Sequence, residues 1–226
     1  METYVVRLWL PDRPGALGEV ATRIGAVGGE IVGIDILERG GGRAVDELAV
    51  ELPAAELQPL LVKEIGLVEG VSVEEIRPVA EALHDPRLDA LETAALLVGA
   101  SERGELLTAV MDHAHRVVGA GWSAVVSTDD GEVVVGRGEV PSPAWLVAFV
   151  AGSQSSARAA AGEWGPDDVV WSPLPSAGLA MVVGRDGTAY RARERRQVAA
   201  LARIVDTRLA ELSRASSRRA HPSMGC

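Results

Sequence analysis

The sequence predicts an α+β protein built from two consecutive domains, and three observations support this class. Alternating apolar runs and helical runs follow one another from the N-terminus in the order strand, helix, strand, strand, helix, strand. Beyond residue 88 the order changes to a long helix, several strands around an inserted helix, and a closing helix. The chain of 226 residues is 47% hydrophobic, which is enough to bury two small cores.

The first predicted strand, residues 4–10, has apolar side chains at every second position. The face expected to lie under helices carries Tyr4, Val6, Leu8 and Leu10. Arg7 and Trp9 lie on the opposite face. Trp9 is therefore either an ordinary exposed aromatic residue or part of an interface, and its size on an uncovered sheet face favours the interface.

A tight turn, residues 11–15, leads directly into a helix, because Pro14 suits a first helical turn. The helix buries residues at helical spacing, namely Leu17, Val20, Ala21, Ile24 and Val27. The amides of Gly15, Ala16 and Leu17 are expected to be unpaired, and such a terminus attracts a carboxylate or a phosphate. With Asp12 beside it to take an ammonium group, the turn suits a zwitterion such as an amino acid. The alternative is that these residues form only a connecting loop before the helix and bind no ligand.

The remaining elements of the first domain follow from the same periodicities. Strands are predicted at residues 30–39, 44–52 and 71–77, with a turn at 40–42 and a second helix opened by Pro53. The second of these strands alternates, with Leu48, Val50 and Leu52 on one face and Glu47 and Glu51 on the other; the second helix buries Leu57, Leu60 and Leu61. The resulting order, βαββαβ, is that of a ferredoxin-like fold.

The run Asp12-Arg13-Pro14-Gly15-Ala16-Leu17, followed by Ile24 and by residues 29–34, resembles the ACT domain. That family has the pattern D-x-P-G-x-L, a helix, and N-I-x-x-I. The resemblance covers about the first third of the chain. Glu30 departs from it, because the family often has Asn at this position.

The ACT resemblance implies a ligand site shared by two chains. In the family, the ligand commonly lies between the loop after the first strand and the second strand of a neighbouring ACT domain, which implies at least a homodimer. The expected ligand-binding residues are Asp12, Arg13, Pro14, Gly15, Ala16 and Leu17 of one chain, and Val32, Gly33 and Ile34 of its partner.

A connector without clear periodicity, residues 79–88, precedes the second domain. A helical stripe follows at Leu106, Leu107, Val110, Met111, Ala114, Val117 and Val118. Strands are predicted at residues 122–128, 132–137, 168–171 and 179–184, with Asp129-Asp130-Gly131 as a hairpin turn. Ser142 and Pro143 open an inserted helix. The closing helix carries Val198, Leu201, Ala202, Val205, Leu209 and Leu212.

This order of elements, and the ending at residues 190–209, resembles a GAF domain between about residues 88 and 212. GAF domains usually pair through their first and last helices, so the apolar stripes belong either to a dimer interface or to the core. A GAF pocket would lie under the inserted helix. Its candidate lining residues are Trp122, Trp145, Phe149, Trp164 and Trp171, for most of which core filling is the favoured alternative.

Known catalytic and metal-binding patterns are poorly represented. The sequence has no G-x-x-x-x-G-K, G-x-S-x-G or H-E-x-x-H motif, and Lys63 is its single lysine. His113 and His115 are two residues apart on a predicted helix and diverge, while His84 and His221 fall in the connector and the tail. Cys226 is the single cysteine, which excludes an intrachain disulfide. No catalytic residue, metal or cofactor is expected.

The formal net charge of −10 repels a phosphate backbone, so nucleic-acid binding is not expected. No run approaches the length of a membrane span, and no basic region followed by an apolar block opens the sequence, so a cytoplasmic protein without membrane association is expected.

The sequence thus predicts an ACT domain at residues 1–78, a linker at 79–88, a GAF-like domain at 89–212 and a disordered tail at 213–226. The expected function is that of a non-catalytic regulatory protein, in which a small amino acid binds at an ACT dimer interface and the GAF-like domain transmits the signal to a separate target protein. The alternatives are an enzyme with an unrecognised site in the GAF-like pocket and a pure dimerisation module without a ligand.

Overall fold

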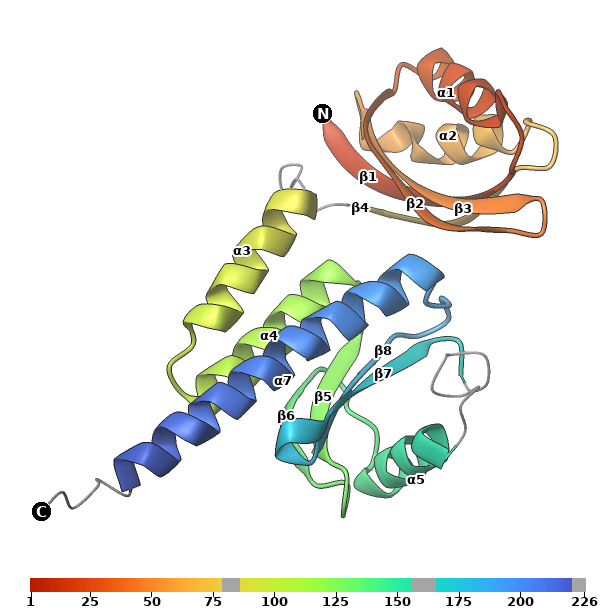
Figure 1. Ribbon diagram of the computed structural model, residues 1–226. Coiled ribbons are helices and arrows are strands. Elements are labelled where there is room, and N and C mark those ends of the chain that lie inside the picture. Colours follow the sequence, from red (N-terminus) through yellow and green to blue (C-terminus); the bar gives the residue numbers. More distant parts are fainter. Residues whose placement is uncertain (79–85, 156–165, 221–226) are drawn as a thin grey trace, which may run out of the picture. The chain divides into compact units, whose positions relative to one another are not determined.

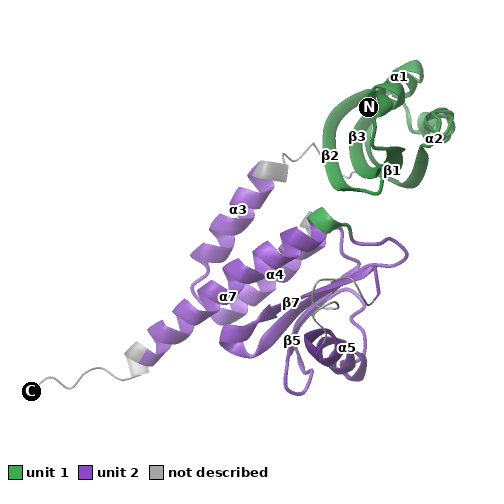
Figure 2. Ribbon diagram, turned by 45° about the vertical axis from the view of Figure 1, so that its right-hand side comes forward, with its two compact units in different colours: residues 1–84, 191–193 green, residues 85–190, 194–226 purple. Residues whose placement is uncertain are grey.

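The computed structural model describes residues 1–78, 86–155 and 166–220. The chain divides into two compact units, of which unit 1 comprises residues 1–84 and 191–193 and unit 2 comprises residues 85–190 and 194–226 (Figure 2). Each unit has its own four-stranded antiparallel sheet and its own apolar core. The predicted α+β class is confirmed.

Unit 1 has the predicted ferredoxin-like arrangement, with two helices on one face of the sheet (Figure 1). The strand order is β2-β3-β1-β4, and all neighbouring strands are antiparallel. The elements are β1 (Glu2–Pro11), α1 (Ala16–Ala26), β2 (Glu30–Gly40), β3 (Arg43–Leu52), a 3-10 turn (Ala55–Leu57), α2 (Gln58–Ile65) and β4 (Ser72–Pro78).

The core of unit 1 forms between the sheet and the two helices, as the alternation in β1 predicts. Its buried members from β1 are Tyr4, Val6, Leu8 and Leu10. Val20 and Ile24 of α1, together with Leu61 and Ile65 of α2, pack against them and are fully buried. The second helix differs from the prediction at two points. Helix α2 carries Pro59 rather than Pro53 in its first turn, and Leu60, expected on the buried side, is 42% exposed.

Unit 2 consists of a sheet covered by helices on both faces (Figure 1). The strand order is β6-β5-β8-β7. The elements are α3 (Pro86–Gly99), α4 (Arg103–Val117), β5 (Trp122–Ser127), β6 (Val133–Arg137), α5 (Pro143–Ser155), β7 (Val169–Leu174), a 3-10 turn (Pro175–Ala177), β8 (Leu179–Gly184) and α7 (Ala192–Ala220).

The central strand β5 contributes to two cores because its side chains alternate between the sheet faces. Val125 lies in the cluster formed with α4 and α7, whereas Ala124 and Val126 lie in the cluster formed with α5. All three are fully buried. An antiparallel sheet with flanking helices is the arrangement predicted for the second domain.

Helix α3 is the element that the sequence analysis missed. Part of it falls in the predicted connector, and its apolar residues point in all directions. Thr93 and Leu97 are buried, whereas Leu88, Leu91 and Val98 are exposed. A helix that is apolar on both sides has no clear periodic stripe, so it does not stand out in a sequence. The closing helix α7 also continues beyond its predicted end, to Ala220.

Arg185, which directly follows β8, ties together the ends of the long helices in unit 2. Its guanidinium donates to both carboxylate oxygens of Glu194 in α7 at 2.7 and 3.0 Å, and to the carbonyl oxygen of Val118 after α4 at 2.9 Å. Two further bonds reach the carbonyl oxygens of Thr188 and Ala189. These bonds use all five N–H donors of the side chain. Arg185 is 8% exposed, so these hydrogen bonds replace the hydrogen bonds to water that the guanidinium loses on burial.

Replacing Arg185 by Met is expected to lower the free energy of unfolding of unit 2 by about 3–5 kcal/mol, because the carboxylate of Glu194 would remain buried without its partner. Thermal and chemical denaturation followed by circular dichroism measure this loss. Arg137→Met is the matched control, since Arg137 forms an exposed pair with Asp112 and should change stability little. Equal losses in the two variants would contradict the structural role of Arg185.

Candidate functional site in unit 1

The loop between β1 and α1 exposes main chain at the start of a helix. Residues 12–15 are exposed, and Gly15 has a φ of 89°, a conformation that side-chain-bearing residues rarely adopt. Apart from Gly15 and its two chain neighbours, no heavy atom of the described residues lies within 4 Å of the position that a Cβ of Gly15 would occupy. The amide of Asp12 donates to the carbonyl oxygen of Gly42 at 2.9 Å, which fixes the loop against the β2–β3 turn.

The N-terminus of α1 has no side-chain cap among the described residues. One of the three amides predicted to be unpaired is not, because Ala16 N donates to the carbonyl oxygen of Arg13 at 3.3 Å across the tight turn. The side chain of Ala16 is buried in the core, and that of Leu17 is half-buried. Ala16 therefore holds the helix on the sheet, and the open positions of the loop are Asp12 to Gly15.

Arg13 does not lie across the helix terminus. Its guanidinium forms two hydrogen bonds to the carboxylate of Glu19, at 2.9 and 3.0 Å. These bonds lower the pKa of Glu19 below its usual value and raise that of Arg13. Arg13 is thus held by a residue of the first turn of α1, and none of its atoms lies within 4 Å of the position that a Cβ of Gly15 would occupy.

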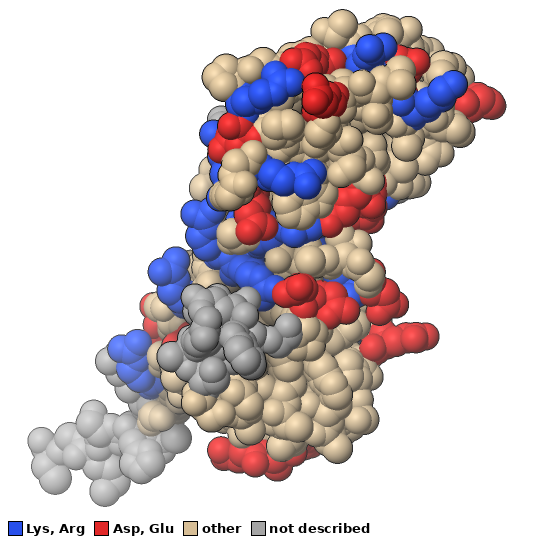
Figure 3. All heavy atoms as spheres, turned by 90° about the vertical axis from the view of Figure 1, so that its right-hand side faces the viewer, with Lys and Arg blue, Asp and Glu red and all other residues tan. Residues whose placement is uncertain are grey.

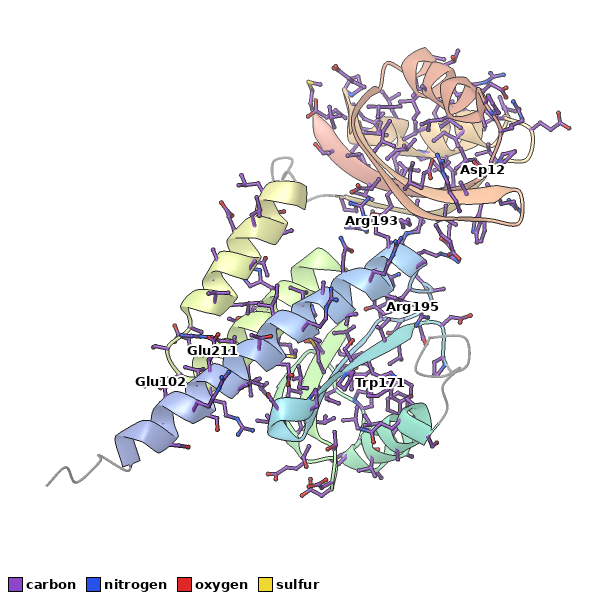
Figure 4. All side chains as sticks on the ribbon, viewed as in Figure 1. Asp12, Glu102, Trp171, Arg193, Arg195 and Glu211 are labelled. Atoms are coloured by element: carbon purple, nitrogen blue, oxygen red, sulfur yellow. The ribbon has the colours of Figure 1, made fainter. Side chains whose placement is uncertain are left out.

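Asp12, labelled in Figure 4, is exposed at the end of β1, and its carboxylate lies 4.0 Å from Nε of Arg39 near the end of β2. A second carboxyl, that of Asp46 in β3, lies close enough for the charges of both Arg39 and Asp12 to act on it. The carboxyls of Asp12 and Asp46 and the guanidinium of Arg39 thus lie at this end of the sheet, where Arg43 pairs with Pro11.

Asp46 is buried on the apolar side of the sheet. It lies opposite Leu8 in β1 and Ile36 in β2, and it is 3% exposed. Its Oδ1 atom has no hydrogen-bond partner among the described residues. Burial raises the pKa of Asp46, the charge of Arg39 opposes this shift, and the charge of Asp12 adds to it.

The sequence analysis did not select Asp46, although the pattern contains a signal for it. Leu48, Val50 and Leu52 lie on the buried face of β3. Because every second residue of a strand shares a face, Asp46 is expected on that face too. An acidic residue on the buried face of a strand is unusual, because a buried charge needs a partner.

The residues expected from a partner chain lie far from this loop within one chain. The strand register places Gly33 level with Val5, and Pro11 level with Gly40. The six-residue offset between Val5 and Pro11 corresponds to about 20 Å along the strand. A single chain therefore does not join the two halves of the predicted site.

Strand β2 lies at the edge of the sheet and is interrupted by a bulge. Val32 falls in the bulge between Ile31 and Gly33. Ile34 is 50% exposed and Ile36 is 40% exposed. Exposed apolar residues on an edge strand are typical of a surface that pairs with another chain.

In unit 2, the aromatic residues predicted to line a pocket gather beneath and on α5. The rings of Trp122 and Trp145 meet edge to face with centroids 6.2 Å apart, and Trp145 stacks on Phe149 at 5.0 Å. Trp171 packs against the same cluster from β7 (Figure 4). Trp164 lies outside the described residues.

Close packing around Trp122 favours the core-filling alternative for that residue. A Cβ on Gly184 would lie 2.3 Å from its indole ring, so the ring rests directly on the main chain of β8. Trp122 is 8% exposed, whereas Trp145 is 37% exposed. The aromatic cluster is thus packed around Trp122 and open to solvent at Trp145.

The histidines of the sequence do not form a metal site in the described residues, where no group of three potential ligands was found. His113 is buried, and its Nδ1 shares a hydrogen bond of 2.7 Å with Oγ1 of Thr93. His84 and His221 lie outside the described residues. Across the same part of the chain, no helix is long and apolar enough to cross a bilayer.

Comparisons with known proteins give structural matches alone. No protein-family model and no curated protein matched the sequence. The chain is similar in fold to ACT domains. The ACT domain of GTP pyrophosphokinase from Chlorobium tepidum matches with 15% identity and a TM-score of 0.28, covering 35% of this chain and 100% of that chain.

Two further solved structures are similar. An ACT domain protein from Streptococcus pneumoniae has 18% identity and a TM-score of 0.30, and the match covers 37% of this chain and 98% of that chain. A bacteriophytochrome from R. palustris has 12% identity and a TM-score of 0.44, and the match covers 84% of this chain and 45% of the bacteriophytochrome. The chain thus matches less than half of that longer protein.

Replacing Asp46 by Asn is expected to raise the free energy of unfolding at pH 7 by about 1–3 kcal/mol, because the neutral amide of similar size removes the cost of burying a charge. Because the pKa of Asp46 is raised in the folded chain, its stabilising contribution is complete below the ordinary carboxyl pKa and is lost as the pH rises through the folded-state value. The gain in the variant should therefore appear between acidic and neutral pH.

Chemical denaturation of both proteins at several pH values measures this difference. Glu51→Gln is the control, because Glu51 belongs to the same strand but to its opposite face. A gain that is equal at all pH values, or that Glu51→Gln reproduces, would argue against a buried and uncompensated Asp46.

Proposed function

We propose that the protein is a non-catalytic regulatory protein that binds a small amino acid between two copies of unit 1. The observation that carries this proposal is the open, uncapped N-terminus of α1 beside the carboxylate of Asp12. A helix N-terminus favours a carboxylate, and a carboxylate such as that of Asp12 favours an ammonium group. An α-amino acid offers both groups a short distance apart.

The edge strand β2 supports a site that is completed by a partner. Ile34 and Ile36 are apolar and exposed, and Val32 lies in a bulge that alters the pairing of β2. In this proposal the loop of one copy, from Asp12 to Leu17, faces residues 32–34 of the other. Unit 2 then transmits the change, either within the dimer or to a separate target protein.

Charge also favours a small zwitterion over a large anion. The upper part of the surface in Figure 3, which is unit 1, shows acidic and basic side chains side by side. The net charge of the chain is −10, and such a charge disfavours nucleic acids and other polyanions. A ligand with no net charge avoids this repulsion.

A pure assembly module is the second candidate function, and α3 is the observation that favours it. Its exposed side carries apolar residues spaced alternately three and four apart, namely Leu88, Leu91, Ala95 and Val98. This is the spacing of a coiled-coil seam. A second copy of α3 would bury the stripe without any ligand.

Calorimetric titration of the wild-type protein with each of the twenty amino acids is expected to give saturable heat for at least one small amino acid. Gly15→Val should weaken that binding by about tenfold or more, because it places a side chain where the ligand approaches the main chain. The control is Gly187→Val in unit 2, where φ is 75° and the space is equally open. The absence of heat with all twenty amino acids would refute the sensor proposal.

Ile34→Glu is expected to dissociate the dimer and to weaken amino-acid binding together, because Ile34 is exposed and its loss leaves the core of unit 1 intact. Sedimentation equilibrium measures the first effect and calorimetry the second. Leu91→Glu on α3 is the matched control. If Leu91→Glu alone produces monomers while Ile34→Glu binds the amino acid normally, the protein assembles through α3 and the shared site is wrong.

A further inference from the structure

Asp46 places a carboxyl group inside the apolar layer of unit 1 without the partners that such a group needs. Its neighbours across the strands, Leu8 and Ile36, are apolar and offer it no hydrogen bond. Oδ1 is buried and has no partner among the described residues. A group of this kind costs stability, so its presence requires either a compensating partner or a role in binding.

The location of Asp46 connects it with the loop that precedes α1. In the sheet, Asp46 lies two residues from Ala44, which pairs with Leu10 at the end of β1. Ala44 and Ala16, the first residue of α1, belong to the same buried cluster. The carboxyl of Asp46 is also within range of the charges on Asp12 and Arg39. Asp46 thus lies on the helix side of the sheet, near the end of β1 that leads into this loop.

Two independent observations therefore coincide at this place. The first is a helix N-terminus that no side chain of the described residues caps, with open space at the Cβ position of Gly15. The second is a carboxyl group, more than nine-tenths buried, with one oxygen that finds no hydrogen-bond partner in the same part of the chain. The terminus favours a negative group, and the carboxyl favours a positive group that can donate hydrogen bonds.

We propose that Asp46 is a ligand-recognition residue whose carboxylate receives the ammonium group of the bound amino acid. This inference rests on the function proposed above and specifies how the ligand is oriented. The ammonium group points inward to Asp46, with Asp12 at the entrance, and the ligand carboxylate lies at the N-terminus of α1. Arg39 balances one of the two acidic groups.

This orientation restricts the class of ligand. The amino group must be free and charged, since an acylated nitrogen is neutral and has lost two of its donors. A side-chain carboxylate that points toward Asp12 and Asp46 is disfavoured, because like charges repel one another. The positive charges of Arg39 and Arg43 also lie at this end of the sheet, so the ligand's α-carboxylate is not repelled there.

The test compares Asp46→Asn with the wild-type protein by calorimetry, using the twenty amino acids and the N-acetyl derivative of each one that binds. Asp46→Asn preserves the size of the side chain and removes its charge. It is expected to lower the affinity for the free amino acid by about tenfold or more, and the N-acetyl derivatives are expected not to bind the wild type. Glu51→Gln, which removes a carboxylate from the other face of β3, should bind normally.

Thermal melting of Asp46→Asn shows whether the variant is folded, so that a loss of binding is not a loss of structure. If Asp46→Asn binds the amino acid as tightly as the wild type, or if the wild type binds the N-acetyl derivative as tightly as the free amino acid, the role of Asp46 is refuted while the sensor function stands. If the wild type binds no amino acid, both proposals fall.

Discussion

Burying a charged group costs free energy unless hydrogen bonds replace the lost water, and two side chains of this protein meet that constraint in opposite ways. Arg185 is buried with all five of its donors bonded, and the groups that it joins are the end of α4, the start of α7 and the chain between them. Asp46 is buried with one oxygen that has no hydrogen-bond partner within residues 1–78, 86–155 and 166–220. A satisfied charge fixes a structure, whereas an unsatisfied one leaves an interaction for a ligand to complete.

The β1–α1 loop likewise contains some groups that are paired or packed and others that have no partner among the described residues. Arg13 is paired with Glu19 and Ala16 is packed in the core, so both hold the loop in place. Gly15 is open, and α1 is not capped by a side chain. A site made of main-chain donors recognises the groups that all amino acids share, while charges around it decide which amino acids are excluded. Selectivity in the proposed site therefore depends on the charged side chains of Asp12, Arg39 and Asp46 rather than on the main chain of the loop.

The sequence predicted the elements whose periodicity is clear and missed those without one. The strand β1 and the helices α1, α4 and α5 begin near their predicted positions, because one side of each is buried or a proline marks the start. Helix α3 has apolar residues on its buried and its exposed side, so no single apolar stripe stands out against a polar face. Within the site, the motif identified the loop, but Asp46 comes from a strand far along the chain. Only the register of β3 against β1 brings Asp46 close to that loop.

A ligand that contacts two copies of the chain binds the dimer and not the monomer, and thermodynamic linkage then applies in both directions. If dimerisation raises the affinity for the amino acid by a given factor, the amino acid raises the affinity of dimerisation by the same factor. The free energy that the ligand recovers at the unsatisfied carboxyl of Asp46 contributes to this coupling only if the geometry of the pocket differs between monomer and dimer. An edge strand with a bulge at Val32 and exposed isoleucines at 34 and 36 offers such a difference, because its pairing is the part of unit 1 that a second copy can change.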